Sequence, residues 1–345
     1  YYHGTILFVE GIDHSCQCIF ILVNVVAVEL NGKLTAFRMM YTHVPTTTDT
    51  QVLTLWDDVD QTFVILEFID RFACSVCRMV VDNDQIVIFG YSGSATELTI
   101  PETIEGYPVT AIGASAFKQM DKLESVTLPD GVLTIGQYAF QKCTALKTVD
   151  LGNSLITVGA YAFDGCAGLT FLELPDTVET IKAYAFRDCS SLGGITYPVN
   201  LKTVDDGYGA GIFSGCTALT AVVVPEGVTA LPANVFYYAD SLKKVTLPST
   251  LTSIGNNAFI NSGITSLELP DGVTEIGNCA FQSCTALESL DLGGSLISIG
   301  NYAFANCDSL KSILLSNAID TVSPYMFQNC RSLLQGQQSC LPGIS

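Results

Sequence analysis

The stretch Ile135 to Leu151, IGQYAFQKCTALKTVDL, contains the unit from which most of this chain is built. Its Phe140 recurs at steps of 23 residues, with one step of 27 and one of 22, and an Ala precedes the Phe in seven of the ten copies. A pattern that repeats ten times at this period predicts a solenoid, in which each coil packs only on its neighbours. The ten phenylalanines are Phe117, Phe140, Phe163, Phe186, Phe213, Phe236, Phe259, Phe281, Phe304 and Phe327.

The apolar positions of one coil predict a short helical turn followed by a short strand. Phe140, Cys143 and Leu146 have the spacing of one helix face, which we expect to turn inward. In the strand 148–150, the middle residue points inward and its two neighbours point outward. A second extended piece at 156–159 returns the chain to the next coil. Stacking the coils would line up the phenylalanines as a buried column and the strands as a parallel sheet.

The pattern L-P-x-x-V-T-x-I-G-x-x-A-F-x-x-C-x-x-L, as in Leu269 to Leu287, resembles the BspA-like leucine-rich repeat, also called the Treponema pallidum type. The resemblance covers residues 86–334. It implies an α/β solenoid, a leucine-rich-repeat superhelix of about ten coils with a parallel β-sheet. It also implies a secreted or surface-attached protein used in adhesion and protein binding, and it supplies no catalytic residues.

Outside the repeat, we expect a β-rich N-terminal segment of unknown family over residues 1–85 and a C-terminal tail or cap over 335–345. The predicted strands include Gln51 to Trp56, Thr62 to Ile69 and Gln85 to Phe89, which are rich in β-branched and aromatic residues. Asn31-Gly32 and Asp82-Asn83-Asp84 have the composition of hairpin turns.

Several residue groups could suggest a metal or catalytic site, but their spacing favours simpler interpretations. A CxC and a CxxC motif far apart are a weak zinc signal, so a local disulfide or buried thiols are favoured. A carboxylate cluster lacks the spacing of a calcium loop and is expected to be a solvated turn. The histidines lack a recognisable partner motif, and we predict no metal, no cofactor and no enzyme activity. These groups are Cys16 and Cys18 with Cys74 and Cys77; Asp57, Asp58 and Asp60; and His3, His14 and His43.

Most cysteines share one position in the repeat, three residues after the phenylalanine. Other coils place Met120, Ala239 or Ser262 there. A position that accepts Met, Ala or Ser indicates selection for small volume, so buried thiols are favoured over disulfides between neighbouring coils. The seven cysteines are Cys143, Cys166, Cys189, Cys216, Cys284, Cys307 and Cys330.

The charge balance is acidic, with 34 Asp and Glu against 15 Lys and Arg. Because phosphate binding needs a basic stripe, nucleic acid is not an expected partner. No apolar run is long enough for a membrane span, since the run Cys18 to Val28 is interrupted by Asn24. The Gly-rich insertion 205–211 lacks the lysine and context of a phosphate loop, so we interpret it as a bulge.

The outward strand positions are the predicted binding surface. Most are small and polar, whereas a few are apolar or acidic, as expected of contact points. We predict a noncatalytic extracellular or cell-surface module that binds a host or neighbouring-cell protein through this face. The alternative is a structural component that self-associates into a fibre or surface layer. The candidate residues are Thr148, Asp150, Phe171, Glu173, Val223, Lys244, Glu268, Asp291 and Leu314.

Overall fold

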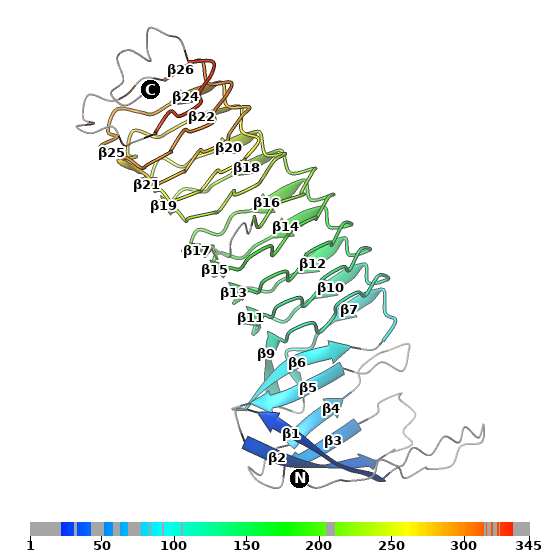
Figure 1. Cartoon of the computed structure of the whole chain (residues 1–345). Helices are drawn as coiled ribbons and strands as arrows, with labels where there is room; N and C mark the ends of the chain where they lie inside the picture. Colours follow the sequence, from blue (N-terminus) through cyan, green and yellow to red (C-terminus); the bar gives the residue numbers. More distant parts are fainter. Residues whose placement is uncertain are drawn as a thin grey trace.

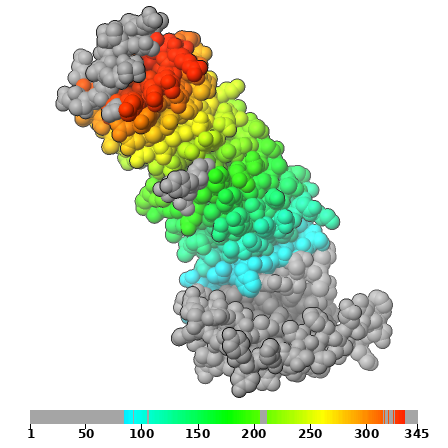
Figure 2. All heavy atoms as spheres, viewed as in Figure 1, coloured from blue at the N-terminus to red at the C-terminus, as the bar shows by residue number. Residues whose placement is uncertain are grey.

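The computed structural model is an elongated stack of coils that begins beside an N-terminal sheet (Figure 1). The space-filling view shows the coloured coils as one elongated body (Figure 2). It describes residues 22–30, 33–42, 52–57, 63–67, 77–82, 84–91, 93–104, 106–204, 211–313, 315, 319, 323 and 325–333. Side chains are described from residue 84 onward. No helix occurs among these residues, and so none that could cross a membrane.

Each coil contributes one strand of two or three residues to the first side of the stack. These strands pair in parallel and in register with the strand one coil away, as β10 and β12 do through Val126 and Val149. These parallel strands form four short sheets along the stack rather than one continuous sheet. The strands are β7 (Glu97–Thr99), β10 (Ser125–Thr127), β12 (Thr148–Asp150), β14 (Phe171–Glu173), β16 (Gly194–Thr196), β18 (Ala221–Val223), β20 (Lys244–Thr246), β22 (Ser266–Glu268), β24 (Ser289–Asp291) and β26 (Ser312–Ile313).

A second set of two-residue strands forms another side of the stack and confirms the predicted return segment. Beginning at β9 (Tyr107–Ile112), the strands β11, β13, β15 and β17 pair in this order up to the insertion, and β19, β21, β23 and β25 pair in this order after it. Residues 205–210 of the insertion lie outside the described residues. The strands are β11 (Thr134–Ile135), β13 (Thr157–Val158), β15 (Thr180–Ile181), β17 (Thr203–Val204), β19 (Ala230–Leu231), β21 (Ser253–Ile254), β23 (Glu275–Ile276) and β25 (Ser298–Ile299).

The segment expected to be helical is instead a series of tight turns, so that part of the prediction is wrong. The N–H of Cys143 donates to the carbonyl of Phe140 at 3.1 Å, three residues earlier, as in a turn. Tyr138 and Lys142 both have φ of 60°, a left-handed conformation that interrupts a right-handed helix. The N–H of Lys142 then donates to Asp164 in the next coil at 2.7 Å. Hydrogen bonds between coils therefore replace those within a helix.

The phenylalanines form the predicted buried column inside the stack. Rings of neighbouring coils lie face to face; Phe117 and Phe140, for example, have centroids 5.0 Å apart and planes 7° apart. The spacing widens to 6.5 Å between Phe213 and Phe236, the pair that follows the insertion. All ten rings are buried. Burying one Phe side chain contributes about 1.5–3 kcal/mol, so the column is a large part of the core.

The cysteines lie beside this column as free buried thiols, which confirms the favoured interpretation. The Sγ of Cys166 donates to the carbonyl of Phe140 at 3.1 Å, and the same bond links Cys143 to Phe117 at 3.0 Å. The side chain is small enough for the core and also satisfies a buried carbonyl. Ser262, at the same position, instead places its hydroxyl 3.4 Å from the Sγ of Cys284 in the next coil.

The N-terminal part is β-rich, as predicted. Four strands form an antiparallel sheet in the order β1-β2-β3-β4. A hairpin then leads into the solenoid, where Ile86 and Ile88 of β6 are buried and β6 pairs in parallel with β9. The elements are β1 (Leu22–Leu30), β2 (Lys33–Thr42), β3 (Val52–Asp57), β4 (Phe63–Glu67), β5 (Cys77–Asp82), β6 (Gln85–Tyr91), β8 (Thr103–Ile104) and β9 (Tyr107–Ile112).

Candidate protein-binding face

The first and third residues of the long strands form one exposed surface, which we call the strand face. In β12 the middle residue, Val149, is buried, and its neighbours Thr148 and Asp150 are exposed. The same alternation holds in β14, β18, β20, β22 and β24. Figure 1 shows these strands stacked one above the other. Because neighbouring strands are in register, their exposed residues line up in two rows along the solenoid.

Eight of the nine predicted site residues lie on this face and are exposed. They are Thr148, Asp150, Phe171, Glu173, Val223, Lys244, Glu268 and Asp291. Phe171 is 52% exposed and Val223 is 63% exposed, which is high for apolar side chains. The ninth, Leu314, lies outside the described residues.

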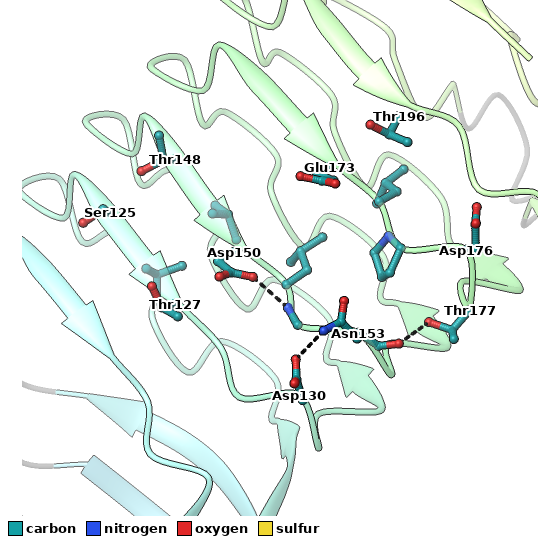
Figure 3. Close-up of a pocket in the computed structure, with 16 residues that line it drawn as sticks. Ser125, Thr127, Asp130, Thr148, Asp150, Asn153, Glu173, Asp176, Thr177 and Thr196 are labelled. Atoms are coloured by element: carbon teal, nitrogen blue, oxygen red, sulfur yellow. Dashed lines mark hydrogen bonds between the residues drawn. The ribbon is translucent and has the colours of Figure 1, made fainter. Parts of the chain in front are cut away.

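A groove of about 780 Å³ crosses the strand face over β10, β12, β14 and β16. Its wall includes hydroxyls such as Thr148 and Thr196 and the carboxylates of Asp150 and Glu173 (Figure 3). A second, smaller hollow of about 430 Å³ lies over β22, β24 and β26, with Glu268 in its lining. The two hollows divide the strand face into an N-terminal and a C-terminal part.

The turns that follow the strands supply groove residues that sequence reasoning missed. Asp130, Asn153, Asp176 and Thr177 lie in these turns along one edge of the groove (Figure 3). Asn153 Nδ2 donates to Asp130 Oδ1 at 2.9 Å, and this bond holds the rims of two coils together. The signal was present in the sequence, because the Leu-Pro-Asp or Leu-Gly-Asn triplet directly follows the strand.

The groove is strongly acidic. Asp130, Asp150, Glu173 and Asp176 all line it, and no Lys or Arg does. None of the ion pairs in the described part of the chain involves these four carboxylates. Lys147, the lysine nearest in sequence to Asp150, pairs instead with Glu124 at 2.6 Å. The negative potential of the groove is therefore not neutralised from within the described chain.

Most of the other residue groups that the sequence singled out lie outside the described residues. Within the described residues, no three or more His, Cys, Asp or Glu side chains are placed to hold a metal ion. Cys16, Cys18, Cys74, His3, His14, His43, Asp58, Asp60 and the tail 335–345 lie outside the described residues, and the side chains of Cys77 and Asp57 are not described.

The fold and the face define a leucine-rich-repeat solenoid. The BspA type leucine rich repeat region matches residues 110–208 and 207–334 in six copies, which is more than half of the chain. The chain therefore belongs to the BspA-type leucine-rich repeat family.

Similar solved structures are bacterial repeat proteins. A leucine-rich repeat protein of Bacteroides ovatus is 21% identical, with 77% of this chain and 87% of that chain covered and a TM-score of 0.42. A leucine rich cell surface protein of Faecalibacterium prausnitzii is 25% identical, covering 74% and 85% with a TM-score of 0.40. The leucine-rich repeat protein of T. pallidum is 26% identical, covering 68% and 87% with a TM-score of 0.39. No curated protein matches the chain.

Proposed function

We propose that this chain is a noncatalytic, secreted or cell-surface module that binds a host or neighbouring-cell protein through the strand face. The observation that carries the proposal is the continuous exposed face, on which Phe171 and Val223 are highly exposed among polar and acidic side chains. Exposed apolar side chains with a polar surround are typical of protein contact sites.

The shape of the face supports a protein partner over a small molecule. Small-molecule sites are usually enclosed and mostly apolar. Here the larger groove is open along four strands and lined by hydroxyls, an amide and carboxylates. A long, rigid surface built from stacked coils offers many weak contacts at once, which suits a polypeptide.

The test is binding of the full chain to a panel of purified host extracellular proteins, measured by surface plasmon resonance. For each protein that binds, a face variant is compared: Phe171→Ala with Asp150→Lys, Glu173→Lys, Glu268→Lys and Asp291→Lys. The control variant carries Glu102→Lys, Asp121→Lys, Glu275→Lys and Ile297→Ala. Its four residues are exposed and lie off the strand face.

We expect the face variant to lose affinity by about a hundredfold or more, while the control stays within about threefold. If the face variant binds every partner as tightly as the parent does, the strand face is not the binding site.

A further inference from the structure

Acidic side chains lie next to one another on neighbouring strands of the face. Glu268 of β22 is directly in register with Asp291 of β24. Asp150 and Glu173 hold the same strand position in the consecutive coils of β12 and β14 and project over the same groove (Figure 3). Like charges on adjacent strands destabilise a sheet by about 0.2–1 kcal/mol per pair. The fold therefore retains a repulsion that a cation arriving from outside would relieve.

An exposed aromatic ring, which does not itself line the groove over β10–β16, lies beside it on the strand face. Phe171 is in β14, and its ring lies over Gly194 of β16, with Cδ2 3.1 Å from the place of a Gly194 Cβ. Gly194 leaves room for the ring, because a side chain there would meet it. The exposed ring is thus held beside Glu173, two residues along the same strand.

These features fit the side chains of lysine and arginine. Such side chains have an apolar stem that packs on an aromatic ring and a cationic end that pairs with carboxylates. A metal ion fits less well, since the described carboxylates are not clustered to ligate one. Nucleic acid is repelled by the same charge.

The geometry of the groove favours an extended segment. It crosses four strands that stack at about 4.8 Å, so its floor is about 14 Å long, the length of about four extended residues. The strands beneath already pair with one another, as β10 does with β7 and β12. A ligand is therefore contacted by side chains of the face rather than by adding a strand at an edge.

We propose that the groove over β10–β16 binds a short, extended, basic segment of a partner protein. Its Lys or Arg groups pair with Asp150, Glu173 and the rim carboxylates Asp130 and Asp176, and one stem packs on Phe171. This inference rests on the proposed function, because it names the kind of segment that the strand face takes.

The probe is a fluorescein-labelled peptide of about ten residues in which Lys and Ser alternate, titrated with the full chain by fluorescence anisotropy. The matched peptide has Glu in place of Lys. The test variant is Asp150→Asn with Glu173→Gln, and a second variant is Phe171→Ala. The control variant is Asp121→Asn with Glu275→Gln, which removes the same charge from exposed positions off the face.

We expect the Lys peptide to bind and the Glu peptide not to bind. The Asp150/Glu173 variant should weaken binding about tenfold or more, and Phe171→Ala should weaken it severalfold, whereas the control stays within about twofold. Because the test variant removes a like-charge contact, its melting temperature should equal or exceed that of the parent, so weaker binding would not reflect misfolding.

Equal weakening by the test and control variants would mean general attraction to an acidic chain and would overturn the inference. Absence of Lys-peptide binding would also overturn the inference. So would displacement of the bound Lys peptide by calcium ions that supply the same concentration of positive charge as the peptide. None of these results affects the proposed function, which fails only if the face variant keeps its affinity for intact partner proteins.

Discussion

Arg187 holds the buried carboxylate of Asp164, one coil earlier, with two hydrogen bonds, from Nε at 2.7 Å and from Nη2 at 3.1 Å. Gln141, one coil earlier still, donates to the same carboxylate at 2.8 Å. The hydrogen bond to Asp164 raises the pKa of Arg187 above its usual value. Three coils are thus joined by one polar cluster beside the phenylalanine column.

Replacing Arg187 with Met should destabilise the protein, since a carboxylate that is almost fully buried would lose its countercharge. Because Arg187 is about a third exposed, we expect a moderate decrease of about 1–3 kcal/mol in the free energy of unfolding, measured by urea denaturation. Adding Asp164→Asn to Arg187→Met should recover part of this loss. A double variant whose loss equals the sum of the two single losses would contradict the account of the cluster.

The phenylalanine column predicts that the loss of stability on replacing a Phe with Ala depends on its position. Phe163→Ala should cost about 3–5 kcal/mol, because the ring is fully buried between Phe140 and Phe186. Phe171→Ala, on the exposed face, should change stability by less than about 0.5 kcal/mol. Urea denaturation followed by circular dichroism measures both. Similar losses for the two variants would be inconsistent with an internal column.

Tyr197 predicts a stabilising substitution. Tyr197 is 3% exposed, and its hydroxyl has no hydrogen-bond partner among the described residues. Burial also raises the pKa of Tyr197, since the apolar surroundings disfavour the charged form. Tyr197→Phe removes the unpaired hydroxyl and should stabilise the protein by about 1 kcal/mol. Tyr138→Phe, at a half-buried ring, is the control and should be neutral; a destabilised Tyr197→Phe variant would show that the hydroxyl has a partner.

The ion pair of Glu288 and Lys311 predicts a contribution to folding stability that depends on pH. Their charged atoms lie 2.5 Å apart across neighbouring coils, and the hydrogen bond from Lys311 lowers the pKa of Glu288. A lowered folded-state pKa gives stability that is present above the unfolded pKa and lost as pH falls through the folded pKa. Lys311→Met should therefore lower the melting temperature slightly at about pH 7 and not at about pH 3. An equal effect at both pH values would rule out the ion pair as its cause.

Periodicity was sufficient to predict the solenoid, the inward residues and the return strands. The spacing of Phe140 and Cys143 reports which side chains are inside, but it does not report how the backbone brings them there. A helix and a series of turns satisfy the same spacing, and the choice depends on Tyr138 and Lys142 adopting positive φ. That conformation is stabilised by hydrogen bonds to the next coil, which no single repeat reveals.

The candidate face was predictable only in part. Alternation along each strand placed Asp150 and Glu173 outward, and both are exposed. The groove that they share depends on the turns after the strands, where Asp130 and Asp176 lie. These turn positions come together through stacking of coils, which sequence spacing alone does not measure.

The most direct test of the strand face is site-specific photocrosslinking. A benzophenone amino acid is placed at position 171, on the face, or at position 297, an equally exposed position off it. Each protein is irradiated with a partner found in the binding screen, and the products are mapped by mass spectrometry. We predict that position 171 crosslinks to the partner and position 297 does not; crosslinking from 297 without crosslinking from 171 would contradict the account.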